Sequence, residues 1–190
     1  IKINSKKTPD FKGIEIKSYK KGGDISLMTT QPDGGERYSM LFRDYMKKFG
    51  WFSKKKSVSE ERTGRYYFTG PFWVSKPDSD QKKDYHLRLV GFDSSNEKFD
   101  LNDIYVGLYR KSDNKLVSSW TGKKLFEHWN QKHSEALYVE YESRSLVNDM
   151  GETVKEYRFK EKCIYCKGTT LSKFFDALKK NFVAYDPADV

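Results

Sequence analysis

The chain has 190 residues, of which 36% are hydrophobic and 16% aromatic, and it carries a formal charge of +9. This composition excludes a disordered chain, because it provides enough apolar surface for a folded core. No apolar run approaches the roughly 20 residues that a membrane-spanning helix needs. A basic, aromatic-rich domain favours a polyanionic partner, most often nucleic acid. The alternative is that the surplus of lysines serves only solubility.

The first third of the chain contains the clearest strand pattern. Residues 12–19 alternate, with Ile14 and Ile16 on one face and charged residues on the other, which predicts a strand. Gly22 and Gly23 predict a turn, and residues 24–31 a second strand that would complete a hairpin. Residues 32–50 contain apolar side chains at helical spacing, and Gly50 is expected to cap the helix that they predict.

The rest of the chain predicts further strands and two helices. Alternating apolar residues predict a meander of strands at 84–93, 103–112 and 115–122, with a hairpin turn at Asp113–Asn114. A helix is expected over 121–137 with Thr121 as its N-cap, and another over 169–181. Three further strands are predicted at 136–145, 153–168 and 182–187. Residues 53–64 are expected to form a loop. The pattern favours one domain of mixed α and β structure over residues 1–190, with a mixed sheet flanked by helices.

Chemistry is concentrated in the segment PDFKGIEIK, residues 9–17. Glu15 and Lys17 point to the same face of a strand because they are two residues apart. Asp10 follows Pro9 on a predicted turn that can fold back beside Glu15. Two carboxylates and the backbone carbonyl of Ile16 would supply oxygen ligands for Mg²⁺, which leaves its other positions to water and substrate phosphate.

Such a site is suited to phosphodiester hydrolysis. A bound metal lowers the pKa of its water and polarises the phosphate, and a lysine near that water can orient it or neutralise developing charge. The spacing P-D-x(4)-E-x-K is the PD-(D/E)xK nuclease signature. A solvated charged strand is the alternative for a bare E-x-K, but the preceding Pro9–Asp10 and the alternating GIEIKS favour the nuclease.

The segment PDFKGIEIKS resembles the active-site strand of the MvaI/BcnI-type restriction endonucleases, which belong to the PD-(D/E)xK superfamily. Weaker similarities follow in the same order, at residues 24–32, 118–143 and 171–186. The resemblance implies a restriction-endonuclease-like core and Mg²⁺-dependent cleavage of double-stranded DNA at a short recognition sequence. It also implies a monomer or weak dimer that cuts one strand and then the other. Asp10 and Glu15 would then bind metal, and Lys17 would assist the attacking water.

Other basic and aromatic residues are candidates for DNA contact. Lys20 and Lys21 follow the motif strand, and Arg144 lies between two predicted strands, where its guanidinium could reach a guanine edge. The remaining candidates are Lys54, Lys55, Lys56, Trp73 and Lys76. Of the three histidines, His133 at a helix end is expected to interact with the helix dipole.

Two features bear on the setting of the chain. Cys163 and Cys166 lie in an alternating segment, which favours two free thiols of a strand and a cytoplasmic protein over a redox or zinc site. The chain starts at Ile1, so we expect a trimmed chain or a domain from a longer protein. An endonuclease is the first interpretation. A non-catalytic DNA-binding or specificity domain of a larger restriction or repair protein is the second, and a basic protein-interaction module the third.

Overall fold

The computed structural model describes residues 9–52, 65–76, 84–95 and 99–187. The chain divides into two compact units. Unit 1 comprises Ile1–Thr30 and Phe126–Thr170, and unit 2 comprises Gln31–Leu125 and Leu171–Val190. Each unit has a sheet of its own, and together they give the mixed α and β composition that the sequence predicts. The interpretation as one domain stays a prediction.

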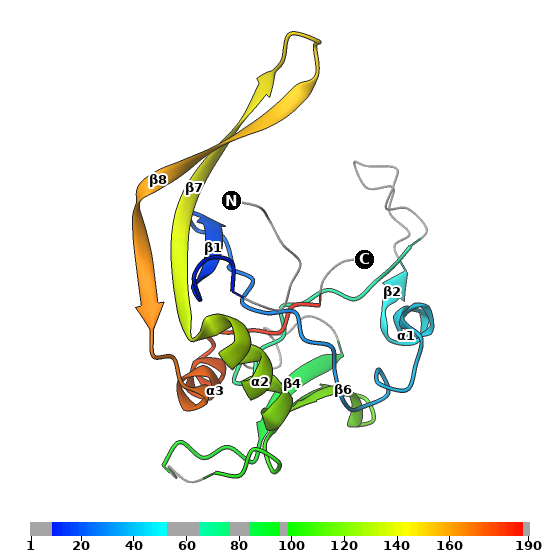
Figure 1. The fold of residues 1–190 in the computed structure, drawn as a ribbon. Helices are drawn as coiled ribbons and strands as arrows, with labels where there is room; N and C mark the ends of the chain where they lie inside the picture. Colours follow the sequence, from blue (N-terminus) through cyan, green and yellow to red (C-terminus); the bar gives the residue numbers. More distant parts are fainter. Residues whose placement is uncertain (1–8, 53–64, 77–83, 96–98, 188–190) are drawn as a thin grey trace. The chain divides into compact units, whose positions relative to one another are not determined.

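Unit 1 is built on a three-stranded mixed sheet in the order β1-β7-β8 (Figure 1). The strands are β1 (Glu15–Lys20), β7 (Glu135–Val147) and β8 (Thr153–Lys167). Strand β1 is parallel to β7, with Glu15 opposite Ala136 and Lys20 opposite Tyr141. Strands β7 and β8 form an antiparallel hairpin whose register shifts between Val139 and Tyr141. The sheet therefore joins the N-terminal motif to a hairpin more than a hundred residues later.

Helix α2 (Gly122–His133) leads directly into β7. The Thr121 hydroxyl accepts a hydrogen bond from the backbone N–H of Lys124 at 3.3 Å, so the predicted N-cap is confirmed. Leu125 and Trp129, four residues apart, are both buried, as the helical spacing predicts.

Unit 2 contains an antiparallel sheet in the order β4-β5-β6 and a two-stranded ladder of β2 and β3. Its elements are α1 (Phe42–Phe49), β2 (Trp51–Phe52), β3 (Tyr66–Tyr67), β4 (Tyr85–Val90), β5 (Tyr105–Arg110), β6 (Lys115–Thr121) and α3 (Leu171–Lys179). The meander predicted for the middle of the chain is confirmed. The turn between β5 and β6 contains Asn114 at φ 55°, a conformation that Asn tolerates better than most residues.

Aromatic side chains fill the core of unit 2. Phe68 is 1% exposed, and four rings surround it at centroid distances of 5.1 to 5.8 Å, from Tyr45, Trp51, Phe72 and Tyr85. These tilted and edge-to-face arrangements are the geometries that aromatic pairs prefer. The high aromatic content of the chain thus supplies a large share of this core, beside aliphatic residues such as Leu87, Ile104 and Leu108.

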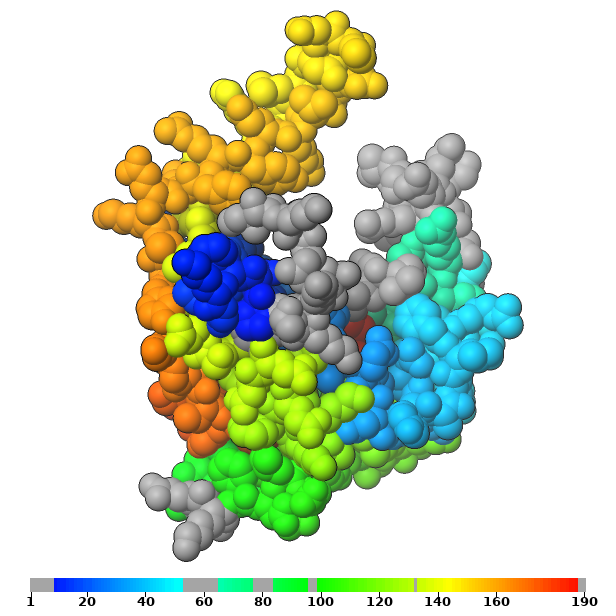
Figure 2. All heavy atoms as spheres, viewed as in Figure 1, coloured from blue at the N-terminus to red at the C-terminus, as the bar shows by residue number. Residues whose placement is uncertain are grey.

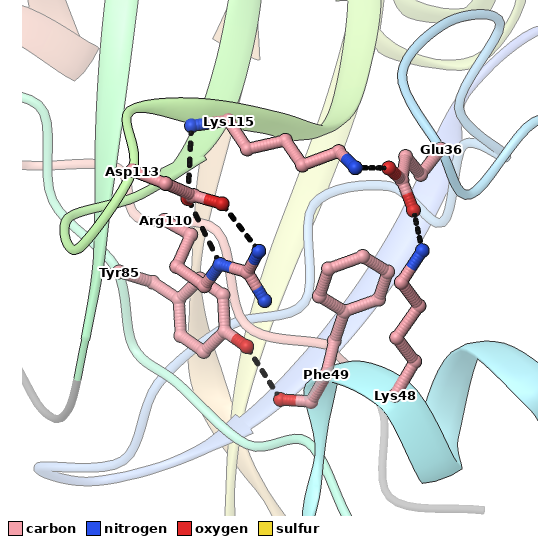
Figure 3. A network of polar contacts seen from close by, with 7 residues as sticks. All are labelled: Glu36, Lys48, Phe49, Tyr85, Arg110, Asp113 and Lys115. Atoms are coloured by element: carbon pink, nitrogen blue, oxygen red, sulfur yellow. Dashed lines mark hydrogen bonds and ion pairs between the residues drawn. The ribbon is translucent and has the colours of Figure 1, made fainter.

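A polar network lies beside this core (Figure 3). Glu36 forms ion pairs with Lys48 of α1 and Lys115 of β6. Arg110 binds both oxygens of Asp113, with its Nε 2.9 Å from Oδ1 and its Nη2 2.5 Å from Oδ2. This pairing lowers the pKa of Asp113 to about 2. The ion pairs tie the hairpin of β5 and β6 to the start of unit 2.

Two predicted strands are wrong. Residues 24–31 follow a turn at Gly22–Gly23, but they form no ladder with any described residue. Strand β1 pairs with β7 as an edge strand, and its Ile16 N–H donates to the Asp10 carboxylate. In residues 182–187 only Tyr185 pairs, in an isolated bridge to Phe72. The loop predicted at 53–64 lies outside the described residues.

The helix predicted over 32–50 is confirmed only in its second half, because α1 begins at Phe42 and residues 32–41 are not helical. The helix predicted over 169–181 is confirmed as α3. Gly50 caps α1, and its N–H donates to the Met46 carbonyl at 3.0 Å. Only part of the predicted stripe is core, because Tyr38 is 70% exposed whereas Tyr45 and Phe49 are buried. In α3, the apolar face is buried as predicted, through Leu171, Phe174, Phe175 and Leu178. Among the described residues, no helix has the length and apolar character to cross a membrane.

We expect Tyr85→Phe to destabilise the protein by about 1–2 kcal/mol, the cost of a buried carbonyl that loses its donor. The Tyr85 hydroxyl donates to the Phe49 carbonyl at 2.7 Å in a buried setting. Urea unfolding measures the effect. The control Tyr38→Phe, at an exposed position, should change stability by less than about 0.5 kcal/mol. Equal effects of the two variants would contradict the assignment.

We also expect the contribution of Asp113 to stability to depend on pH in the acid range. Because the folded pKa of Asp113, about 2, lies below its ordinary value of 3.8, the contribution is present above about pH 4 and is lost as the pH falls towards 2. Asp113→Asn should therefore lower Tm at pH 5, and this difference from the parent should disappear near pH 2. Thermal scans across this range would test it, and a difference that is constant with pH would argue against the ion pair.

Candidate active site

A two-residue turn precedes β1 and returns the chain towards it. Phe11 and Ile14 face each other in an antiparallel bridge, with N–H to carbonyl distances of 3.1 and 2.8 Å. The residues between them, Lys12 and Gly13, have φ values of 48° and 84°. Positive φ at both central positions defines a type I′-like hairpin turn, and Gly13 adopts it without a Cβ penalty. The turn brings Asp10 back alongside β1.

The carboxylate of Asp10 is held by the backbone of β1. Its Oδ2 accepts a hydrogen bond from the N–H of Ile16 at 3.0 Å in a partly buried setting. The amide belongs to the residue between Glu15 and Lys17, so the Asp10 carboxylate lies within hydrogen-bonding distance of the motif strand. The turn therefore brings Asp10 to Ile16 of β1, which lies six residues further along the chain.

Glu15 and Lys17 form an ion pair on one face of β1. The Lys17 Nζ is 2.9 Å from the Glu15 Oε1, and their side chains are 21% and 3% exposed. A carboxylate that is removed from water to this extent needs a compensating charge. Lys17 supplies that charge and, being more exposed, keeps contact with solvent.

The sequence does not place His133 or Tyr138 near the candidate site. His133, the last residue of α2, is 2% exposed and stacks on Trp129 with ring centroids 4.5 Å apart. The pKa of His133 is lowered, mainly by burial and further by the charge of Lys17. The Leu27 backbone and Glu15 raise it by less. The ring is thus kept neutral at pH 7, and the prediction of a charged partner for the helix dipole is wrong.

Tyr138 is the second of these groups. It lies opposite Lys17 in the register of β1 and β7, so both side chains belong to the same face of the sheet. Burial raises the pKa of Tyr138, and the neighbouring Cys166 and Glu15 raise it further. The i, i+4 spacing of Trp129 and His133 could have indicated a shared helix face, but nothing local in the sequence indicates that this face meets β1.

The donor set suits a hard divalent cation that keeps much of its own coordination. Within the described part of the chain, no group of three or more His, Cys, Asp and Glu side chains is arranged to hold a metal ion. Two carboxylates on adjacent elements are the pattern that Mg²⁺ uses when water and substrate phosphate complete its shell. Asp10 and Glu15 fit such a site by their chemistry.

The residues predicted to contact DNA lie in different parts of the chain. Lys20 ends β1, Lys21 follows it, and both are exposed. Lys76 of unit 2 has its Nζ 4.2 Å from the centre of the Trp73 ring. Arg144, exposed on β7, is ion-paired with Glu156 of β8. Lys54, Lys55 and Lys56 lie outside the described residues. Contact with DNA stays a prediction for all of them.

Comparison with known proteins identifies the family. The model of the MvaI/BcnI restriction endonuclease family matches residues 1–189, so the chain belongs to this family. No curated protein matches the chain.

Two solved structures are similar to the chain. The structure of restriction endonuclease MvaI in complex with its cognate DNA substrate has a TM-score of 0.59 and 16% sequence identity, and the match covers 97% of this chain and 67% of MvaI. At this identity, the similarity confirms the restriction-endonuclease-like fold. The structure of MvaI in the absence of DNA has a TM-score of 0.42 at 16% identity, covering 90% of this chain and 62% of the other. The chain thus spans about two thirds of the length of MvaI.

We expect Asp10→Ala to be less stable than Asp10→Asn by about 1 kcal/mol, because the asparagine side-chain oxygen can still accept the Ile16 N–H. Urea unfolding in the presence of EDTA measures this difference without a contribution from bound metal. If both variants match the parent, the hydrogen bond does not hold Asp10 at β1.

Proposed function

We propose that the protein is a Mg²⁺-dependent endonuclease that cleaves double-stranded DNA at a specific sequence, with Asp10, Glu15 and Lys17 as its catalytic residues. One observation carries the proposal. A tight turn returns the Asp10 carboxylate to the backbone amide of Ile16, the residue between the ion-paired Glu15 and Lys17, in a chain that belongs to a restriction endonuclease family.

Asp10, Glu15 and the carbonyl of Ile16 would hold the metal. The N–H and C=O of one strand residue point to the same side of the strand. The Ile16 N–H donates to Asp10, so strand geometry supports a position for the Ile16 carbonyl on the side of that carboxylate. When bound, Mg²⁺ would supply charge neutralisation at the scissile phosphate and a water of lowered pKa.

Lys17 has a separate role in this proposal. Its ammonium group is 2.9 Å from the Glu15 carboxylate and partly exposed, so it can both fix the orientation of Glu15 and donate a hydrogen bond outward. Such a donor can orient the attacking water and offset negative charge as it develops on the phosphate. The buried ring of His133 and the half-buried Tyr138 interact electrostatically with this pair, and such interactions are stronger where access of water is reduced.

The charge of the chain is consistent with this substrate. A net charge of +9 attracts the DNA backbone, and Lys20 and Lys21 continue from the motif strand as exposed cations for phosphates near the cut. Two free cysteines on β8 agree with a reducing compartment, and we propose that the protein acts in the cytoplasm.

We expect Glu15→Ala and Glu15→Gln to lower the cleavage rate by about 10³-fold or more, since each removes a ligand for a metal that contributes several kcal/mol to the barrier. DNA binding should be unchanged or tighter, because a carboxylate near phosphate is removed. Conversion of supercoiled plasmid to nicked and linear forms, with Mg²⁺ and with EDTA, measures cleavage. Glu15→Gln preserves the shape of this buried side chain, and Glu161→Gln on the exposed part of β8 serves as the matched control.

The outcomes separate the interpretations. Cleavage by Glu15→Gln at the rate of the parent would falsify the site assignment. An inactive parent whose plasmid binding weakens with salt would favour the non-catalytic DNA-binding domain instead. Discrete fragments from the parent, as opposed to a smear, would support sequence specificity.

A further inference from the structure

The hairpin of β7 and β8 continues well beyond the strand that carries the motif. Strand β1 ends at Lys20 opposite Tyr141. From Glu142 onwards, β7 pairs with β8 alone among the described residues, to the final pair of Val147 and Thr153. Figure 1 shows this part of unit 1 as a long, twisted two-stranded ribbon, and Figure 2 shows its atoms in yellow and orange. We call residues 141–159 the distal ribbon.

Outside the turn, all acidic residues of the distal ribbon lie on one face, together with arginines that face them across the strands. Glu142 lies opposite Arg158, and Arg144 lies opposite Glu156. Arg144 is ion-paired with Glu156, and Glu142 with Lys160. The carboxylates of this face are thus neutralised by cations on the same face.

The other face contains hydroxyl groups, aromatic rings and one lysine. Its cross-strand pairs are Tyr141 with Phe159, Ser143 with Tyr157, Ser145 with Lys155, and Val147 with Thr153. None of these residues is acidic. We call this set the hydroxyl face. The separation follows from the two-residue period of a strand, which directs alternate residues to opposite faces.

We propose that the hydroxyl face binds in a groove of the DNA duplex that the candidate active site would cut. The inference rests on the proposed function and assigns a DNA-recognition surface within it. The major groove admits a two-stranded β-ribbon. Serine, threonine and tyrosine hydroxyls can donate to phosphates and to base edges, Lys155 can neutralise a phosphate, and this face holds no carboxylate to repel the backbone.

The length of the ribbon matches DNA geometry. Ala136 pairs with Glu15, and Ser145 lies nine residues further along β7. At a rise of about 3.4 Å per residue this is about 30 Å, slightly less than one turn of B-DNA, which is about 34 Å. By alternation along β7, Glu15 lies on the face of Glu142 and Arg144. The two strands of the ribbon cross in Figure 1, so the ribbon turns over along its length. A duplex cut at Glu15 would therefore meet the hydroxyl face about one helical turn away, where this twist has turned that face towards it.

The end of the ribbon is held in a defined conformation. The side-chain oxygen of Asn148 accepts hydrogen bonds from the N–H groups of Met150 and Glu152 at 3.1 and 2.9 Å. Its amide nitrogen donates to the Glu152 carboxylate at 3.0 Å. This turn confines its acidic residues, Asp149 and Glu152, to the tip beyond the hydroxyl face. A fixed turn lowers the entropy that the ribbon would lose on binding.

The test compares two single-charge changes on opposite faces. Lys155→Gln removes one cation from the hydroxyl face, and Arg158→Gln removes one from the other face. Both are made in the full chain with Glu15→Gln, so that binding is measured without cleavage. The probe is a fluorescein-labelled duplex of about 30 bp with randomised sequence, long enough for more than two helical turns. Fluorescence anisotropy over a series of NaCl concentrations gives Kd and its salt dependence.

We expect Lys155→Gln to raise Kd about 3- to 10-fold and to reduce the salt slope by about 1, as for the loss of one phosphate contact. Arg158→Gln should change Kd less than about 2-fold. Ser145→Asp, which places a carboxylate on the exposed hydroxyl face, should raise Kd at least about 10-fold. All three positions are exposed, and circular dichroism checks that each variant is folded.

Three results would overturn the inference. The first is that Lys155→Gln and Ser145→Asp bind DNA with the Kd of the parent, although the wild-type protein cleaves plasmid. This result would reject the DNA-binding role of the hydroxyl face and leave the proposed function intact. The second is an equal effect of Arg158→Gln and Lys155→Gln, which indicates non-directional electrostatics. The third is a change of self-association in sedimentation with Ser145→Asp at unchanged Kd, which assigns the face to a second copy of the chain. If wild type neither binds nor cuts DNA, the proposed function fails as well.

Discussion

The parallel pairing of β1 with β7 is the interaction on which unit 1 depends. Its register places Glu15 opposite Ala136 and Lys17 opposite Tyr138, which buries the carboxylate and leaves the lysine at the boundary with solvent. A shift by one residue would move every side chain to the other face of the sheet. The apolar Ile16 would then occupy the position of the carboxylate, and the Asp10 turn would no longer meet the same amide. The local chemistry of the motif thus depends on a contact between segments more than a hundred residues apart.

The same pairing buries an ion pair at the candidate site, so that a desolvation cost opposes a Coulombic attraction. Glu15 is almost fully buried, and it is ion-paired with Lys17, whose side chain is partly exposed. The desolvation cost of such a pair often exceeds its Coulombic gain, so a hydrophobic pair would stabilise the fold equally well or better. Natural sequences retain arrangements of this kind mainly where function needs them. Burial lowers the pKa of the neighbouring His133, which disfavours a second cation beside Lys17.

Local patterns predicted the elements whose partners are close in sequence. The meander of β4, β5 and β6, the N-cap at Thr121 and the buried face of α3 could all be derived from alternation, turn residues and helical spacing. The strand predicted at 24–31 failed because alternation indicates only that a segment could pair. β1 is an edge strand, and the Ile16 N–H that its alternation leaves for a second partner donates to Asp10. For the site, the motif predicted that Asp10 approaches β1. It could not predict His133 or Tyr138, because α2 and β7 join β1 only through tertiary structure.

Net charge and local charge lead to different conclusions about this chain. The total of +9 favours a DNA partner, yet it does not say which surface meets the duplex, since several cations are held in ion pairs: Lys48 and Lys115 by Glu36, Arg110 by Asp113, and Arg144 by Glu156. An ion-paired cation contributes less to counterion release than a lysine without a neighbouring carboxylate. The electrostatic field of the whole protein therefore attracts DNA to the chain. Binding in a defined orientation also requires a surface where hydrogen-bond donors and cations have no neighbouring carboxylate. In the distal ribbon the two-residue period of the strand creates such a face, because it sorts the acids to the other side.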